Sequence, residues 1–254
     1  MRDWVKRFVT PISMSVERSH GVSWGTGTYL EIPGRHILLT NNHVVADVPA
    51  GGRLAHLPGP TDDYMAICDL WHREPYPIDA AFAAIPEVGS AGMKEPVPYS
   101  LVEPRFDTEQ DELLFWIGFP GFTAERHEAP IEARQRMTRF GGPLETLGLP
   151  MLSQAIRDWT GENEKMFDPS FHVAVHYPTA AQRSAKGPVV TLPNAKGMSG
   201  SLLWDTKYVA TLRKSASWSP NDSRVCGIVW GALDDPEVVI VTKIEHVRKA
   251  FGWS

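Results

Sequence analysis

The chain has 254 residues, of which 43% are hydrophobic and 22% are charged, which is ordinary usage for a folded globular protein. The formal net charge of -5 and the absence of a long run of Lys and Arg leave no basic footprint, so nucleic acid is not an expected partner. No segment approaches the roughly 18 consecutive apolar residues that a membrane-crossing helix needs, so we expect no membrane partner either.

The first residues and the number of cysteines indicate the cellular compartment in which we expect the protein. Charges interrupt the opening stretch MRDWVKRFVTPISMS before an apolar region of signal-peptide length forms, so no export signal is expected. Cys68 and Cys226 are the only cysteines, too few for a dense disulfide framework. Two buried free thiols are the expected state, although the spacing leaves a pairing open. Together these features favour a cytoplasmic location.

Short alternating or fully apolar runs follow one another along the chain, separated by Gly, Pro, Asn and Asp. This pattern is typical of antiparallel strands joined by turns. The runs cover residues 25–32, 36–40, 64–71, 79–85, 112–119, 171–177, 189–192, 201–204, 225–233 and 238–244. Only residues 151–159 and 243–251 have the appearance of helices, the second through the helical spacing of its apolar side chains. The predicted fold class is therefore all-β with a short C-terminal helix.

Irregular stretches divide the chain. Residues 86–111 are rich in Pro, Gly and charge and have no sustained period, as expected of a crossing between two groups of strands. We predict a boundary near residue 105, with an N-terminal unit of residues 1–105 and a C-terminal unit of residues 106–254. Residues 121–170 read as a long excursion from the second unit, and residues 205–224 as a long loop.

The stretch NAKGMSGSLLWD, residues 194–205, contains the first candidate for chemistry. Small neighbours expose the hydroxyl of Ser199, and Gly197 lets the backbone bend so that the amides of Gly197 and Ser199 converge on one point, as in an oxyanion hole. A serine hydroxyl needs a neighbouring base to become a nucleophile. His43, in TNNHVV directly after the apolar run HILLT, is the candidate base.

Asp79 completes the set. It opens the apolar run DAAFAAI, and an acid at the edge of a buried strand needs a polar partner. The Nδ1 proton of a histidine is such a partner, and the carboxylate would fix the tautomer and stabilise the imidazolium. The predicted catalytic residues are thus His43, Asp79 and Ser199, in that chain order.

These segments together resemble the trypsin-like (chymotrypsin-fold) serine peptidases, and the disulfide-poor bacterial HtrA-type branch more than the digestive one. ILLTNNHVV is similar to the histidine motif, IDAAFAAI to the aspartate motif and GMSGSLL to the serine motif. The resemblance implies two packed antiparallel β-barrels, with His43 and Asp79 in the first, Ser199 in the second and the active site between them. It also implies that IVWGAL is the substrate-binding strand, so that Val229, Trp230 and Gly231 would pair with an extended peptide.

Several features depart from the family pattern. Met198 stands where digestive members carry the aspartate that receives the new N-terminus on activation, so that ion pair cannot form. No cysteine lies close to His43, and no PDZ domain is expected after residue 254. The base of the specificity pocket would lie around residues 192–195, where nothing acidic stands, and this predicts a neutral, apolar or small preference.

The functional hypothesis is a serine endopeptidase that is narrow in specificity or activated by a protein partner, with a protein or peptide substrate and no cofactor. A catalytically silent peptide- or partner-binding module is the alternative, and an esterase with the same triad is chemically allowed. His172 and His176 lie on one face of a predicted strand, but without a nearby third ligand they predict barrel wall, not a metal site.

Overall fold

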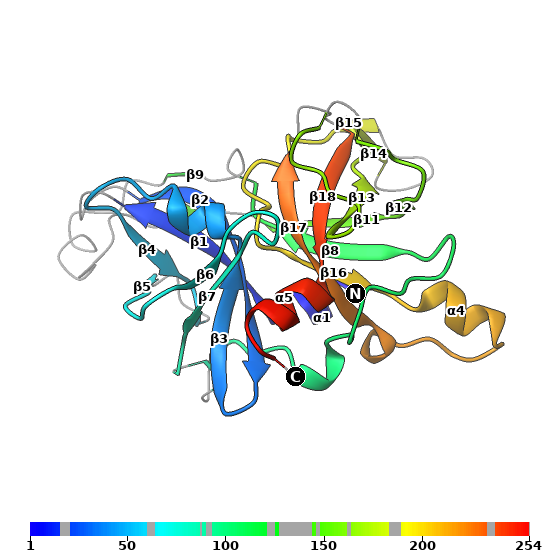
Figure 1. The fold of residues 1–254 in the computed structure, drawn as a ribbon, viewed down its shortest axis with the longest axis horizontal. Coiled ribbons are helices and arrows are strands. Elements are labelled where there is room, and N and C mark those ends of the chain that lie inside the picture. Colours follow the sequence, from blue (N-terminus) through cyan, green and yellow to red (C-terminus); the bar gives the residue numbers. More distant parts are fainter. Residues whose placement is uncertain are drawn as a thin grey trace.

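Figure 1 shows the computed structural model, in which two curled sheets lie side by side. The structure describes residues 1–15, 21–59, 64–86, 88–89, 93–120, 125–126, 144–145, 148–161, 164–182, 189–232 and 237–253. Half of the predicted excursion over residues 121–170 lies outside the described residues. Within the described part, the chain is mainly β, and the predicted fold class is confirmed.

The first sheet has seven antiparallel strands in the order β5-β4-β1-β2-β3-β7-β6. Their bounds are β1 Val9–Ser15, β2 Gly21–Ile32, β3 Arg35–Thr40, β4 Arg53–His56, β5 Met65–Ala66, β6 His72–Glu74 and β7 Ala80–Ala84. The strands β4 and β6 were not predicted, and neither was β1, in which Pro11 breaks the alternation of VTPISMS. All seven of its residues are buried, since it lies between β2 and β4.

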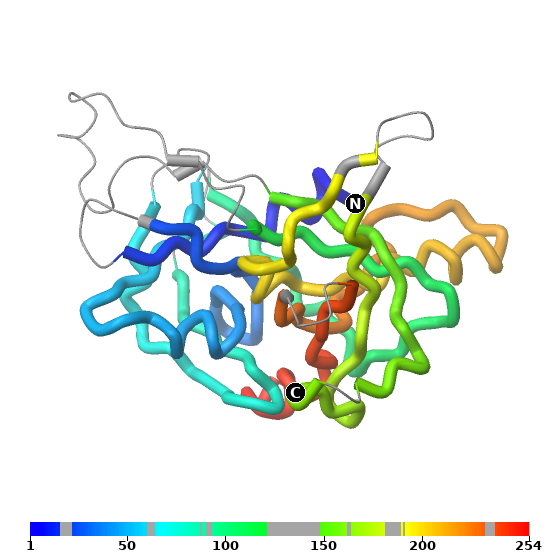
Figure 2. Tube along the Cα trace, turned by 90° about the horizontal axis from the view of Figure 1, so that it is seen from above, coloured from blue at the N-terminus to red at the C-terminus, as the bar shows by residue number. Residues whose placement is uncertain are grey.

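The second sheet also has seven antiparallel strands, in the order β11-β8-β16-β17-β18-β13-β12. Their bounds are β8 Leu114–Gly118, β11 Leu149–Ser153, β12 Ala155–Ile156, β13 His172–His176, β16 Leu202–Asp205, β17 Arg224–Ala232 and β18 Val238–Lys243. The first sheet therefore uses residues 9–84 and the second residues 114–243, and the boundary predicted near residue 105 falls between them. Figure 2 shows the backbone from above as a tube, with the residues of the first sheet in blue to cyan and those of the second in green to red.

Short helices and hairpins complete the described elements. They are α1 Arg2–Val5, α2 Asn42–Ala46, α4 Tyr208–Arg213, α5 Ile244–Ala250, the 3-10 turns η1 Tyr99–Leu101 and η3 Pro220–Asp222, and the strand pairs β9 Glu125–Arg126 with β10 Leu144–Glu145 and β14 Ala180–Gln182 with β15 Val189–Thr191. The predicted C-terminal helix is confirmed as α5. The loop predicted over residues 205–224 contains α4.

Two predicted elements are wrong. Residues 151–159 form no helix, because residues 149–153 pair with β8 and bury Met151 opposite Trp116. Tertiary pairing thus overrides the local preference. The strand predicted over residues 64–71 is reduced to β5, because only Met65 and Ala66 find a partner, in β4.

The largest hydrophobic cluster lies between the two sheets. The first sheet contributes residues such as Leu39 and Phe82, the second Ile117 and Trp204, and the C-terminal helix adds Val247. Each of two smaller hydrophobic clusters packs against one sheet, one on the first and one on the second. Since burying large apolar side chains contributes about 1.5–3 kcal/mol each, the shared cluster holds the sheets in a fixed relation, which a site built from both requires.

The described helices and the thiols bear on two further expectations. No helix in the described ranges is both long enough and apolar enough to cross a bilayer. Both cysteines are free thiols, as predicted, but only Cys226 is buried, and the expectation that Cys68 is buried is wrong. Cys68 lies in the loop after β5, which the sequence pattern assigned to a buried strand.

His56 gives the stability a pH dependence. It is fully buried on β4, its Nδ1 lies 2.8 Å from the Tyr29 hydroxyl, and burial lowers the pKa of His56 to about 4. Between pH 6.5 and pH 4, His56 is protonated in the unfolded chain but neutral in the folded chain. We therefore expect His56 to remove about 3 kcal/mol from the free energy of unfolding as the pH falls from 7 to 4.

Urea unfolding at several pH values measures this loss. The His56→Gln variant should lose less stability than the wild type over the same range, whereas the exposed His176→Gln variant should follow the wild type. Equal losses in His56→Gln and the wild type would show that His56 is not the group responsible.

Candidate active site

His43 and Asp79 form a hydrogen-bonded pair. The ring Nδ1 of His43 lies 2.7 Å from Asp79 Oδ2, and the backbone N–H of His43 donates to Asp79 Oδ1 at 2.9 Å. Both carboxylate oxygens therefore bind one residue, which fixes the carboxylate. The Asp79 side chain is 8% exposed and that of His43 is 40% exposed. The carboxylate is therefore buried, whereas solvent or a ligand can reach the imidazole.

The local fold presents both side chains at the end of the first sheet. His43 lies in the first turn of α2, which follows β3 directly, and Asp79 precedes β7, the strand that pairs with β3. Asp79 adopts a left-handed backbone conformation with φ of 49°, which Asp tolerates better than most residues. The Asn41 amide donates to the Asp79 carbonyl at 2.7 Å and so fixes this turn.

The turn that carries Ser199 belongs to the second half of the chain but is bound by the first sheet. The Thr26 N–H on β2 donates to the Ser199 carbonyl at 2.8 Å, and the Thr26 hydroxyl donates to the Gly197 carbonyl at 2.9 Å. The same hydroxyl accepts from the N–H of Phe119 at 2.9 Å. Thr26 therefore joins β2, the end of β8 and the serine turn.

Gly200 shows how closely the halves approach. A Cβ built on Gly200 would lie 2.0 Å from the Thr26 carbonyl oxygen and 2.3 Å from Thr40 Oγ1, and its φ is 93°. Only glycine fits this position. Gly200 therefore packs directly against Thr26 of β2 and Thr40 of β3. Because Thr40 lies three residues before His43, this contact brings Ser199 and His43 to the same end of the first sheet.

The Ser199 hydroxyl has a partner other than His43. It donates a hydrogen bond to the carbonyl of Trp230 on β17, and within the described residues neither Ser199 Oγ nor His43 Nε2 makes a hydrogen bond to the other. A bulge explains the orientation of that carbonyl. The pairing of β17 with β18 shifts register between Val229 and Gly231, so Trp230 is the extra residue.

The predicted oxyanion residues lie in the same turn. Gly197 has a φ of 96°, and within the part of the chain that the structure describes, the N–H groups of Gly197 and Ser199 donate no hydrogen bond. The N–H of Met198 between them donates to the Ala195 carbonyl at 2.9 Å. Two unengaged amides on either side of an engaged one are the groups that an anionic oxygen would bind.

Met198 holds the serine turn by apolar packing. Its side chain is fully buried in the second-sheet cluster with Trp116, and a Cβ added to Gly118 would lie 2.7 Å from the Met198 Cβ. The turn is thus held by a core side chain and needs no charged partner at this position.

Two of the three predicted substrate-binding residues, Val229 and Gly231, lie against the serine turn. Val229 is fully buried and exchanges backbone hydrogen bonds with the serine turn, from Gly200 N–H to the Val229 carbonyl and from Val229 N–H to the Ser201 carbonyl. A Cβ on Gly231 would lie 2.7 Å from Ser199 Oγ and 3.3 Å from the Ala195 carbonyl oxygen. The space between the Gly231 strand and the serine turn is therefore narrow.

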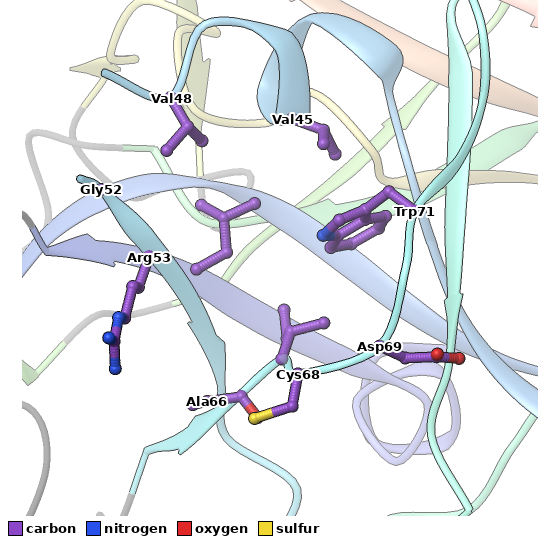
Figure 3. Close-up of a pocket in the computed structure, with 10 residues that line it drawn as sticks. Val45, Val48, Gly52, Arg53, Ala66, Cys68, Asp69 and Trp71 are labelled. Carbon is purple, nitrogen blue, oxygen red and sulfur yellow. The ribbon is translucent and has the colours of Figure 1, made fainter. Parts of the chain in front are cut away.

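The structure has a cavity in each half of the chain. One, of about 150 Å³, is at the predicted pocket base and has a neutral lining of Tyr177, Thr179, Leu192, Pro193, Asn194, Ala195 and Val238. The other, of about 410 Å³, lies beside α2 in the first half (Figure 3), where Val45 and Val48 face Trp71 and Cys68. No group of three potential metal ligands occurs among the described residues.

Sequence reasoning missed several supporting residues. Thr26 and Asn41 carry no motif signal, because their roles depend on hydrogen bonds between segments far apart in the chain. His172 was assigned to the barrel wall, but its ring bonds to the carbonyl of Pro77, two residues before Asp79. The sequence signal at His172 was its place, with His176, in a pair of histidines on one predicted strand.

The two curled seven-stranded antiparallel sheets form two half-barrels, with the His43–Asp79 pair and Ser199 where they meet, which is the arrangement that the resemblance to the chymotrypsin-fold peptidases implies. Among solved structures, the chain is similar to the crystal structure of the MamO protease domain from Magnetospirillum magneticum in its apo form, with a TM-score of 0.48, 11% sequence identity and coverage of 98% of each chain. A scan against protein-family models and a search of curated proteins both gave no match.

Gly200 provides a test of the junction. We expect Gly200→Ala to prevent folding or to lose several kcal/mol more of unfolding free energy than Gly34→Ala, because both positions have a positive φ but only Gly200 faces atoms that a methyl group would overlap. Gly34, at φ 85° with nothing within 4 Å, measures the backbone strain alone. Denaturant unfolding of both variants gives the difference, and equal losses would contradict the packing described.

Proposed function

We propose that the protein is a serine endopeptidase that works through an acyl-enzyme. Ser199 Oγ attacks the carbonyl carbon of the scissile bond while His43 takes its proton, and the proton passes to the leaving amine. Asp79 orients His43, and the amides of Gly197 and Ser199 stabilise the oxyanion. Water then releases the acyl group by the same route.

The observation that carries the proposal is the doubly hydrogen-bonded Asp79 beside His43. A carboxylate that holds Nδ1 of a half-exposed imidazole leaves Nε2 as the only ring nitrogen available to a nucleophile. A merely structural histidine would be expected to have both nitrogens engaged or the ring buried. The unengaged amides of Gly197 and Ser199 add the electrostatic part of the same chemistry.

The hydrogen bond from Ser199 to Trp230 favours a restrained enzyme. Attack requires the hydroxyl to leave the Trp230 carbonyl and turn toward His43 Nε2. Losing one neutral hydrogen bond costs about 0.5–1.5 kcal/mol, which corresponds to a rate reduction of about 2- to 13-fold. Such a cost slows the serine without silencing it, so a substrate or protein partner that displaces the Trp230 carbonyl would raise activity.

The alternative is a silent binding module, and the same hydrogen bond is the observation in its favour. In that case the hydroxyl would stay with Trp230 and the cleft would capture a peptide without cutting it. The small size of the cost favours the enzyme, because a permanently inactive site requires a larger barrier.

Covalent labelling tests the function. We expect a fluorophosphonate probe to modify Ser199 of the purified protein, read as a mass shift on the Ser199 peptide. Ser199→Ala should abolish the label, and His43→Ala and Asp79→Asn should slow labelling by a factor on the order of 10³ or more, because base and orientation are lost.

Ser201→Ala is the matched control, since Ser201 is a second buried serine two residues away whose hydroxyl donates to the Met198 carbonyl at 2.6 Å. This variant should retain the label. A folded wild type that remains unlabelled would favour the binding module.

The lining of the smaller cavity predicts the cleavage preference. Its seven residues carry no charge. We expect a peptide library to be cut after neutral, small or apolar residues. Cleavage mainly after Lys or Arg would contradict this preference.

A further inference from the structure

We propose that His172 is a positioning residue that clamps the turn before Asp79 to the second sheet, and that this clamp sets the geometry of the His43–Asp79 pair. The inference rests on the proposed function only for its effect on rate. The clamp itself is a statement about contacts and can be tested without turnover.

The hydrogen bonds of His172 define its chemical state. It lies on β13 and is 2% exposed. Its Nδ1 accepts from the Asp168 N–H at 2.9 Å, and its Nε2 lies 2.6 Å from the Pro77 carbonyl oxygen. An amide N–H can only donate and a carbonyl can only accept, so the ring must be neutral with its proton on Nε2. Burial, which lowers the pKa of His172, supports this state.

Thr242 binds the next carbonyl of the same turn. Its hydroxyl donates to the Ile78 carbonyl at 2.8 Å. His172 and Thr242 are direct partners across the β13–β18 ladder. Two neighbouring side chains of the second sheet therefore hold the two consecutive carbonyls that precede Asp79, a residue whose left-handed conformation needs support from its surroundings.

The clamp also reaches the strand beside Ser199. The indole Nε1 of Trp230 donates to Thr242 Oγ1 at 2.6 Å, and the Trp230 and His172 rings meet edge to face with centroids 4.6 Å apart. The carbonyl of Trp230 holds the Ser199 hydroxyl. One cluster thus connects the acid of the first sheet with the nucleophile of the second.

Loss of the clamp has a specific consequence. Without His172 and Thr242 the turn would be free to shift, and a displacement of about 1 Å at a catalytic group can reduce a rate about 10²-fold. The contacts within the first sheet, from Asn41 and the His43 N–H, would keep Asp79 nearby. We therefore expect a mispositioned pair, not an unfolded protein.

Four variants separate the possibilities. His172→Phe keeps a ring against Trp230 but removes both hydrogen bonds, whereas His172→Gln retains a donor for the Pro77 carbonyl. Thr242→Val keeps the shape of the side chain and removes both the bond to the Ile78 carbonyl and the acceptor of the Trp230 indole. His176→Gln, at the exposed end of the same strand, is the control.

The first readout is the downfield proton NMR signal of His43 Nδ1–H, which reports its hydrogen bond to Asp79 and needs no substrate. We expect this signal to be broadened or lost in His172→Phe and Thr242→Val, partly restored in His172→Gln and unchanged in His176→Gln. The second readout is the rate of fluorophosphonate labelling, which should fall about 100-fold in His172→Phe and less in His172→Gln.

An unchanged signal in both His172→Phe and Thr242→Val would overturn the clamp. If His172→Phe does not fold, as judged by near-ultraviolet circular dichroism, His172→Gln and Thr242→Val decide by the same signal. A wild type that shows the signal but resists the probe would count against the proposed function and leave the clamp intact. Normal labelling with an unchanged signal in the variants would refute the clamp alone.

Discussion

The candidate site depends on Thr26. Its backbone and hydroxyl bind the turn that carries Ser199, although the two residues are far apart in the sequence and belong to different halves of the chain. Hydrogen bonds of this kind contribute only about 0.5–1.5 kcal/mol each, so they could not hold two independent bodies together. The apolar cluster between the sheets supplies the free energy of association, and Thr26 then fixes the register in which the halves meet.

A second consequence of this division is that each half of the site is incomplete. The first sheet carries an acid and a base and the second carries a hydroxyl and two amides. Neither set does chemistry alone, because a base without a nucleophile transfers no acyl group and a serine without a base is a weak nucleophile. Packing between the sheets is therefore part of the active site, and substitutions in that shared cluster would act on reactivity as well as on stability.

How far the sequence predicts this molecule depends on whether the signal is local. Alternating apolar runs predicted β2, β3 and β7 of the first sheet and β8, β13, β16, β17 and β18 of the second, and glycines beside a serine indicated the turn at Ser199, because these features depend on neighbouring residues. The strand β1 and the false helix over residues 151–159 show the limit. Their conformation is decided by partners in β2, β4 and β8, which no local pattern names. The same holds for Thr26 and His172, whose roles appear only when distant carbonyls come within reach.

The two thiols differ in exposure, so a thiol-directed probe can reach only one of them. Cys226 is fully buried, and burial raises its pKa well above the ordinary value, so it stays a protonated, shielded thiol. Cys68 is exposed and lines the cavity beside α2 (Figure 3). Val45 lines the same cavity and lies in α2, two residues after His43. A thiol-directed fluorophore or spin label would therefore attach at one place without any mutation. From there it would report movements of the helix that carries the catalytic base candidate, while the chemistry of the site itself is left untouched.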